Sequence, residues 1–397
     1  MDGLGIALRT TEGINTLNPA SYSAIDSLTF IFDMGMSGQF SHYTENGLSK
    51  NAKTASFDYA YGAFRAFKNV GMAFGIRPFS NVGYNYYNTT TIATDPNELA
   101  SKTTSTNTYT GGDGLTDNGS TGLHEIFLGA AWRPVKYVSV GVEGGYMWGS
   151  STRTVTNAYN SSYINTLKKV YYMKINTLNF NAGLQVIIPM AKNDNLVLGA
   201  TYKLGHGTKS DIYCNLISTY TSSSTSDTTK FEIGENQKLP HSFGVGVTYS
   251  HGTKFMIGAD YSLQKWGSID YPVFSGTTNG SYKMMSGQLK DRHKFTIGGQ
   301  WLPDPVQRSI FKRIRYRFGL SYTTPYIKVN GKDGPKELSA SLGFGIPIFN
   351  KWNNRSILNI SAQYARVNAS GMIKEDNFRI NIGFTFNERW FMKWKVE

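Results

Sequence analysis

Apolar and polar residues alternate with a period of two along much of this 397-residue chain. Near the C-terminus, the stretch NFRINIGFTF places Phe378, Ile380, Ile382, Phe384 and Phe386 at every second position. Successive side chains of a β-strand point to opposite faces of the sheet, so this stretch has one apolar face and one polar face. The pattern predicts a strand, but a half-buried strand of a soluble sandwich would show the same alternation.

The two faces differ in the charge that they carry. In TLNFNAGLQVII, Leu178, Phe180 and Leu184 lie on a face without charge, and the opposite face holds Asn179 and Gln185. YVSVGVEGGYMW, SFGVGVTYS and ELSASLGFGI repeat this asymmetry, with mostly Gly, Ser, Thr and other hydrophilic residues on the polar face. A lysine or arginine that faces lipid at mid-bilayer costs about 2–4 kcal/mol, so a charge-free apolar face is typical of a transmembrane strand. We therefore expect the apolar face to meet lipid and the polar face to line a lumen.

Fourteen stretches are predicted to be strands, each longer than the roughly 9–11 residues that a tilted strand needs to cross a bilayer. They are residues 27–42, 54–67, 69–88, 122–133, 137–150, 169–189, 195–214, 238–250, 254–268, 289–302, 313–328, 336–349, 356–367 and 376–390. Long polar segments follow the odd-numbered strands: 43–53, 89–121, 151–168, 215–237, 269–288, 329–335 and 368–375. Mostly brief turns follow the even-numbered ones, as in outer-membrane barrels, which have short periplasmic turns and long outer loops. The sequence thus predicts an all-β fold, a 14-stranded antiparallel transmembrane β-barrel in the bacterial outer membrane with periplasmic termini, rather than a secreted or soluble β-protein.

The composition of the chain argues against several classes of protein. The chain has no apolar run of about 18 residues that would form a membrane helix, and its single cysteine, Cys214, excludes an internal disulfide framework. It opens MDGLGIALRT without a basic and apolar leader, so we expect that any export signal has been removed. The six histidines show no metal-ligand spacing, and no Ser-His-Asp set is evident. We expect no enzymatic activity, no metal and no cofactor; and although the net charge is +13, a barrel is a poor candidate for nucleic-acid binding.

The first 26 residues differ from the rest of the chain. They are rich in glycine and turn-forming residues and contain the sequence Asn18, Pro19, Ala20. Fourteen strands enclose a lumen too wide for strand side chains alone to fill. We expect residues 1–26 to form a short hatch segment in the lumen, with the Asn-Pro-Ala sequence against the wall near the periplasmic end. The barrel would then span 27–391, and 392–397 would be a periplasmic tail.

At this point the sequence resembles a known family. A Gly-rich start, an Asn-Pro-Ala motif just before the first strand and fourteen strands look like the FadL/TodX family of long-chain fatty acid transporters. The resemblance implies an N-terminal hatch that contains the motif, here Asn18, Pro19 and Ala20. The stretches NPASYSAIDSLTF and FNERWFMKW look most like the Bacteroidota branch that includes PorV of the type IX secretion system. The N-terminal segment is shorter than in the transporters, which favours the PorV-like branch.

The third predicted strand carries a proline in its middle, in NVGMAFGIRPFSNVGYNYY. The resemblance implies a kink in this strand, because family members that transport open their wall sideways there. Proline has no N–H for a strand ladder, so Arg77 and Pro78 predict a local break in pairing. The alternative is a β-bulge without function.

Charged residues fall into two groups. Those on the polar face are expected to line the lumen, where their mixed signs predict salt bridges to hatch residues such as Arg9 or Glu12 and disfavour an ion-selective porin. The lumenal set contains Asp33, Asp58, Arg77, Glu143, Lys203, Asp260, Arg315, Arg317 and Arg379. The second group is a basic rim on the periplasmic side, which would meet lipid headgroups, solvent or a partner: Arg133, Lys136, Lys192, Lys254, Arg308, Lys312, Arg313, Lys351, Arg355, Arg389, Lys393 and Lys395. The long turn PDPVQRSIFK fits either a short interfacial helix or an irregular connection.

Two functions follow from these features. The first is passage of hydrophobic small molecules across the outer membrane, past the hatch and out through the wall at Pro78. The second is a non-transporting barrel subunit of a multiprotein secretion or protein-assembly machine, as in the PorV-like branch. The expected partners are outer-membrane lipid and lipopolysaccharide, a hydrophobic small-molecule ligand, and outer-membrane or periplasmic proteins.

Overall fold

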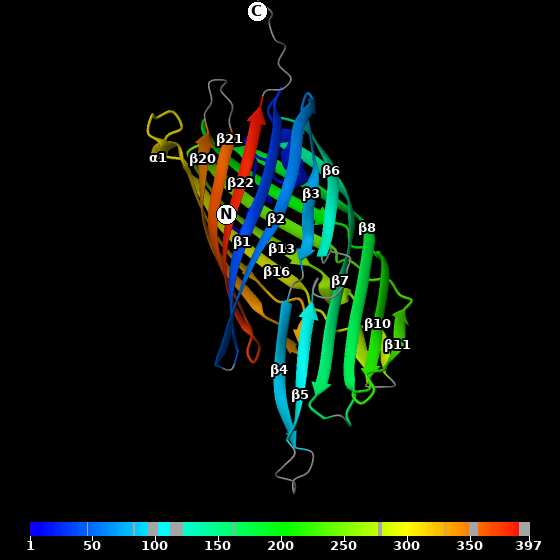
Figure 1. Cartoon of the computed structure of the whole chain (residues 1–397). Helices are drawn as coiled ribbons and strands as arrows, with labels where there is room; N and C mark the ends of the chain where they lie inside the picture. Colours follow the sequence, from blue (N-terminus) through cyan, green and yellow to red (C-terminus); the bar gives the residue numbers. More distant parts are fainter. Residues whose placement is uncertain are drawn as a thin grey trace, which may run out of the picture.

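Fourteen antiparallel strands close into a barrel in the computed structural model of the chain (Figure 1). The structure describes residues 1–45, 47–81, 84–93, 102–111, 122–161, 163–276, 280–329, 331–348 and 356–388. The barrel closes where β1 pairs with β2 on one side and with β22 on the other. The predicted transmembrane barrel of fourteen strands is therefore confirmed. None of the helices in the described residues is long and apolar enough to span a membrane.

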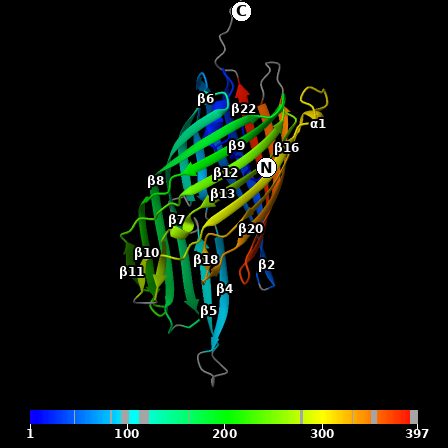
Figure 2. The ribbon, with the colours of Figure 1, turned by 180° about the vertical axis from the view of Figure 1, so that it is seen from behind.

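The barrel strands follow one another around the wall in chain order. They are β1 (Phe30–Glu45), β2 (Leu48–Phe67), β3 (Val70–Asn81), β6 (Gly122–Val135), β7 (Val138–Tyr159), β8 (Thr166–Pro189), β9 (Asp194–Lys203), β12 (Ser242–His251), β13 (Phe255–Gln264), β16 (Arg292–Trp301), β17 (Arg315–Thr323), β20 (Lys336–Ile348), β21 (Ser356–Asn368) and β22 (Lys374–Glu388). Seen from behind, β9, β12, β13 and β16 run side by side as one tilted wall (Figure 2).

The alternation along each strand separates the outside of the barrel from its lumen. Leu178 and Phe180 of β8 are 56% and 48% exposed on the outer surface, whereas Asn179 between them is buried in the lumen. Ile382 of β22 is likewise exposed, and its neighbour in the register, Met36 of β1, is 54% exposed. The apolar face therefore points outward all along these strands, as a lipid-facing surface requires.

The long connections opposite the short turns contain more strand than the sequence pattern predicted. Where it predicted a polar segment over 89–121, β4 (Tyr84–Ala93) and β5 (Lys102–Gly111) pair, and β5 continues the wall by pairing with β7. Likewise, β10 (Lys209–Thr219) and β11 (Ser226–Ile233) extend the wall from β8. The prediction was wrong here because a strand beyond the lipid needs no apolar face, while threonine and tyrosine still favour extended backbone.

The remaining elements are short. The end opposite the short turns carries the hairpins β14 (Tyr271–Ser275) with β15 (Ser281–Met285) and β18 (Lys328–Val329) with β19 (Lys332–Asp333), and the turn η2 (Trp266–Ser268). Most of the predicted polar segment 43–53 is strand, because β1 continues to Glu45 and β2 begins at Leu48. At the short-turn end, the single-turn helix α1 (Ile310–Arg313) projects from the wall (Figure 1). Five predicted rim residues, Lys351, Arg355, Arg389, Lys393 and Lys395, and the tail 392–397 lie outside the described residues.

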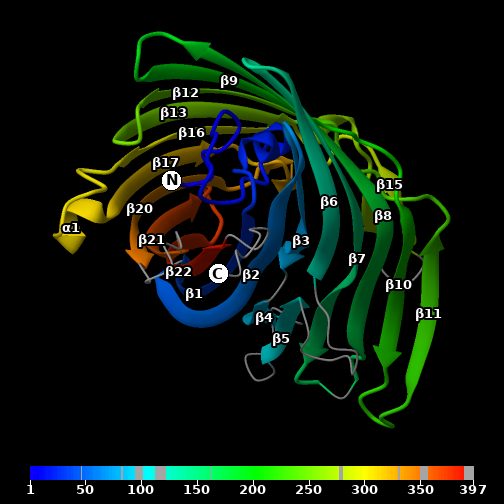
Figure 3. The same cartoon turned by 90° about the horizontal axis from the view of Figure 1, so that it is seen from above.

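The N-terminal segment lies inside the barrel, where Figure 3 shows it encircled by the strands. It contains the 3₁₀-helix η1 (Pro19–Ala24), which packs against β3, β6, β7 and β8. Its apolar side chains Leu4, Ile6 and Tyr22 are buried against the lumenal wall. A segment of turn-forming residues thus fills part of a lumen that the strand side chains leave open.

Candidate functional site

Asn18 fixes the N-terminal segment to the wall. Its side chain is completely buried and caps η1 by accepting a hydrogen bond from the Ala20 N–H at 3.0 Å. Its Nδ2 donates to the Ile6 carbonyl at 2.7 Å and to the Leu184 carbonyl of β8 at 3.2 Å. Pro19 follows at the first helical position, where its missing N–H costs nothing. One amide therefore ties together both halves of the N-terminal segment and the barrel wall.

Glycines on the lumenal face make room for this segment. A Cβ at Gly71 of β3 would lie 1.9 Å from the Tyr22 carbonyl oxygen, and one at Gly183 of β8 would lie 2.0 Å from Asn18 Oδ1. At Gly141 of β7 a Cβ would lie 2.5 Å from the Ala20 nitrogen. These distances are shorter than any ordinary contact, so the segment can approach the wall backbone only where no side chain stands. The sequence pattern placed small residues on this face but did not indicate what they accommodate.

Three of the predicted lumenal charges contact the N-terminal segment. Asp260 of β13 accepts from the backbone N–H groups of Gly5 at 2.6 Å and Ile6 at 2.8 Å. Arg315 of β17 forms an ion pair with Glu12, and Glu143 of β7 accepts from the Tyr22 hydroxyl.

Arg9, in contrast, meets neutral groups in the lumen. It donates to the hydroxyls of Ser139 and Ser23 at 3.1 Å each and to Gln185 Oε1 at 3.3 Å. The structure thus places an ion pair at Glu12 and neutral acceptors around Arg9.

The other lumenal charges bond to the wall itself. Each of them contacts a polar side chain or an aromatic ring on another strand. Asp33 accepts from Thr385, Asp58 from Ser37, Arg317 donates to Gln300 and Asn359, Arg379 donates to Gln39, and the Lys203 ammonium lies 4.7 Å from the Phe79 ring centroid. These groups therefore stabilise the lumenal surface, and Asp33 also accepts a hydrogen bond from the backbone of Ile14 in the N-terminal segment.

A buried network joins the N-terminal segment to the strand that carries Pro78. The Tyr22 hydroxyl donates to Glu143 Oε2 at 2.5 Å, and Arg77 Nη2 donates to Glu143 Oε1 at 2.7 Å. Arg77 Nε donates to Glu125 Oε2 at 2.9 Å, and the other oxygen of Glu125 accepts from Asn179. Both carboxylate side chains are only 3% exposed. Burial, with the adjacent Glu143 carboxylate, raises the pKa of Tyr22 well above its usual range, so Tyr22 stays protonated and donates.

Sequence reasoning missed Tyr22 and Glu125. Two features of the sequence could have indicated them. Tyr22 is the only aromatic residue in the first 26 positions, and Glu125 is a charged residue on the polar face of its strand. Their meeting could not be read from spacing, because β6, β7 and the N-terminal segment come together only when the barrel closes.

The pairing between β2 and β3 stops beside Pro78. The register runs from Phe67 opposite Val70 to Ala60 opposite Ile76 and ends there. Past that point, the described part of β2, residues 48–59, pairs with β1 alone, and β4 pairs with β5 instead of β2. On its other side, β3 stays paired with β6 through Pro78, and the register shifts between Pro78 and Ser80. Strands β2 and β4 accordingly run apart in the half of the barrel away from the short turns (Figure 1).

Aromatic side chains line the lumen next to this break. The rings of Tyr59 and Tyr61 stack at 4.7 Å, and Tyr61 meets Phe127 edge-on at 5.4 Å. The Arg77 guanidinium lies 4.6 Å from the centroid of Phe127. These rings, with Tyr22 of the N-terminal segment, belong to one apolar cluster. An apolar surface therefore extends from the N-terminal segment to the unpaired edge.

Within the residues that the structure describes, no group of three or more His, Cys, Asp or Glu side chains is arranged to hold a metal ion.

Comparison with known proteins gives a family and a set of related folds. A family model described as BamG matches residues 1–397. Among solved structures, the CymD monoaromatic hydrocarbon channel has a TM-score of 0.62 at 13% identity, covering 98% of this chain and 96% of the channel. The Ralstonia pickettii toluene transporter TbuX (TM-score 0.58, 12% identity, 93% and 92% covered) and the Pseudomonas putida toluene transporter TodX (0.58, 12%, 98% and 97%) have the same fold. No curated protein matches the sequence. At these identities the likeness is one of fold.

Proposed function

The chain belongs to the BamG family, and we propose that this FadL-like outer-membrane barrel passes hydrophobic small molecules through an opening in its wall beside Pro78. In this proposal, residues 1–26 act as the hatch, with Asn18, Pro19 and Ala20 as its anchor, and the termini and short turns face the periplasm. Arg77 and Pro78 mark the opening. The observation that carries the proposal is the end of the β2–β3 ladder at Ala60 and Ile76.

An unpaired strand edge is expensive in a bilayer. Each N–H or C=O without a partner costs several kcal/mol in hydrocarbon, so an open edge occurs only where it borders water or protein. Residues 48–59 of β2 have such an edge on the side away from β1, among the residues described. Pro78 adds no unpaired donor to the break, because proline has no N–H. In this proposal, the part of the edge at membrane depth borders a water-filled opening in the wall.

The surroundings of the break fit an apolar solute. Tyr59, Tyr61 and Phe127 pack into an aromatic cluster beside the break, so the wall next to the proposed opening is apolar. The related structures, a monoaromatic hydrocarbon channel and two toluene transporters, are named for molecules of this kind. We therefore propose a small hydrophobic compound as the solute.

A second aromatic site lies at the outer end, where a solute would arrive first. Tyr171, Tyr172, Tyr271 and Tyr282 contribute to a cavity of about 100 Å³ between β8 and the β14–β15 hairpin. The Arg153 guanidinium covers the Tyr171 ring at 4.4 Å. We propose this cavity as the entry site for the same class of molecule.

Replacing Pro78 by valine is expected to reduce uptake of a hydrophobic probe by about two- to tenfold, the factor that corresponds to one added strand hydrogen bond. Valine restores the N–H and favours extended pairing, so it strengthens the ladder at the break. Uptake of radiolabelled toluene would be measured in cells that produce equal amounts of each barrel.

The matched control is Pro347→Val. Pro347 lies in β20, where pairing with β21 continues without interruption past the proline. It should leave uptake unchanged, and both variants should keep the shift in gel mobility on heating that marks a folded barrel. Equal uptake by wild type and the Pro78 variant would contradict the lateral route.

The alternative function, a barrel subunit of an outer-membrane secretion or assembly machine in the PorV-like branch, is favoured by one surface. Val306 and Phe311, in and beside α1, are 88% and 70% exposed on a projection at the short-turn end. Native purification separates the two functions: stoichiometric co-purifying proteins would support the subunit role, and a bound hydrophobic molecule would support passage.

A further inference from the structure

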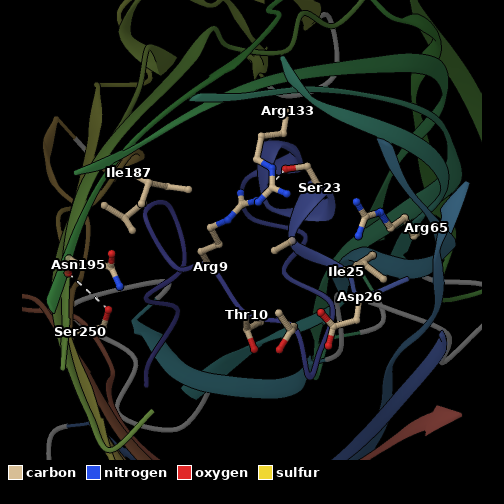
Figure 4. A pocket seen from close by; sticks show the side chains of 13 residues that line it. Arg9, Thr10, Ser23, Ile25, Asp26, Arg65, Arg133, Ile187, Asn195 and Ser250 are labelled. Carbon is tan, nitrogen blue, oxygen red and sulfur yellow. Dashed lines mark hydrogen bonds between the residues drawn. The ribbon is translucent and has the colours of Figure 1, made fainter. Parts of the chain in front are cut away.

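A cavity of about 350 Å³ lies between the N-terminal segment and the short-turn mouth of the barrel. Figure 4 shows Arg9, Arg65 and Arg133 pointing into it from the N-terminal segment, from β2 and from β6. Neither proposed function uses this arginine pocket, because it lies on the opposite side of the N-terminal segment from the outer half of the barrel.

The three guanidinium groups lie close together, and none of them has an acidic partner within the part of the chain that the structure describes. Arg65 Nη2 and Arg133 Nη2 lie 3.5 Å and 3.4 Å from the same acceptor, Asn69 Oδ1. The side-chain acceptors of Arg9 are all neutral. None of the ion pairs among the described residues involves any of these three arginines.

The positive charges of the three arginine side chains repel one another in this arrangement. Burial and the positive charge of Arg133 lower the pKa of Arg9 to about 10. Asp26 also lines the cavity, so three positive groups face one negative group there. An incoming anion would relieve the excess positive charge, and arginine offers paired N–H donors that match a carboxylate or phosphate.

The rest of the lining makes the pocket amphipathic. The hydroxyl of Ser23 lies beside Arg9, while Ile25, Ile187 and Val197 contribute apolar surface. Figure 4 shows Ile187 and Ile25 on the wall and segment around the arginines. A cavity of about 350 Å³ is at the lower end of the range for small-molecule sites, so it has room for an anionic group and a short apolar chain.

We propose that the arginine pocket binds an oxyanion, a carboxylate or a phosphate, carried on a short apolar chain that enters from the short-turn mouth. Arg65 and Arg133 hold the oxyanion together with Arg9, and Ile187 and Val197 contact the chain. This site goes beyond the proposed passage of hydrophobic molecules and does not depend on it.

Equilibrium binding to the purified full chain in lipid nanodiscs tests the proposal, with octyl phosphate, octanoate, octanol and inorganic phosphate as the probes. Wild type should bind octyl phosphate or octanoate at one saturable site, and binding should weaken as salt is added. The double variant Arg65→Gln/Arg133→Gln should weaken this binding at least about tenfold, the loss expected for charge-assisted pairs. Arg366→Gln, an exposed arginine at the far end of β21, should bind like wild type. Heat-dependent gel mobility would show that each variant is folded.

The other probes decide what the site recognises. Octanol should not compete, because it lacks the charge. Equal affinity for inorganic phosphate and octyl phosphate would overturn the amphiphile assignment, and equal binding by wild type and the double variant would overturn the site. Uptake of neutral toluene by the double variant is expected to match wild type, so failure of this proposal and failure of the passage proposal give different results.

Discussion

Replacing Arg77 by methionine is expected to lower the free energy of unfolding of the barrel by about 3–5 kcal/mol, the loss typical of a buried ion pair from which one partner is removed. Arg77 is the only cation that forms ion pairs with Glu125 and Glu143 among the described residues, at 2.9 Å and 2.7 Å. Both carboxylates are 3% exposed, so water cannot replace the lost guanidinium. Urea-dependent unfolding in phospholipid vesicles would measure the change.

Two further variants separate this effect from general damage. The triple variant Arg77→Met/Glu125→Gln/Glu143→Gln removes all three charges and should recover most of the loss, because no uncompensated charge stays buried. Arg366→Gln breaks an ion pair whose arginine is 50% exposed, and such surface pairs contribute less than about 1 kcal/mol. If Arg77→Met were no more damaging than Arg366→Gln, the network would not be a buried ionic one.

The double variant Gly71→Ala/Gly183→Ala is expected to dislodge the N-terminal segment while leaving the barrel folded. Its methyl groups would lie 1.9 Å from the Tyr22 carbonyl oxygen and 2.0 Å from Asn18 Oδ1. Overpacking of this kind costs about 1–3 kcal/mol at each position. Since about 1.4 kcal/mol is a factor of ten in an equilibrium, trypsin cleavage after Arg9 should accelerate about tenfold or more. Conductance in planar bilayers should rise in parallel, because the emptied lumen of a wide barrel admits water.

Gly343→Ala is the matched control for this pair. Gly343 also faces the lumen, but the three atoms nearest to a Cβ there all belong to wall residues, with Ser361 Cβ the closest at 3.2 Å. Its cleavage rate and conductance should equal those of wild type. Unchanged cleavage in the double variant would mean that the segment does not depend on close contact with the wall backbone.

The two variants act on one connected structure. Tyr22, whose carbonyl oxygen lies over Gly71, also donates to Glu143 of the Arg77 network. Displacing the segment therefore removes a hydrogen bond from the carboxylate that Arg77 binds, one residue before Pro78. We therefore expect the Arg77 network to contribute less to the free energy of unfolding in the double glycine variant. The same urea titration would measure this decrease.

The sequence by itself determined the elements that depend on local pattern. Alternation such as Leu178, Asn179, Phe180 marks a strand and both of its faces, since the period of two is a property of extended backbone. The number of strands follows because every lipid-crossing strand repeats that signal. The polarity of Asp260 and Arg315 likewise placed them on the lumenal face. The pattern failed for β5 and β11 and for the ends of β4 and β10, where threonine, serine and asparagine interrupt the alternation.

Only the tertiary structure decided which of these residues meet. Asp260 binds backbone N–H groups 254 and 255 positions away, and Arg9, Arg65 and Arg133 converge from three separate segments. Spacing along the chain gives no information on such contacts, because they form when the closing barrel brings distant strands around the N-terminal segment. At Pro78, too, the sequence predicted one part of the result and the tertiary structure decided the other. Its missing N–H predicts a weak point in a ladder, but the loss of pairing on the β2 side, with pairing kept on the β6 side, depends on how three strands curve around the lumen.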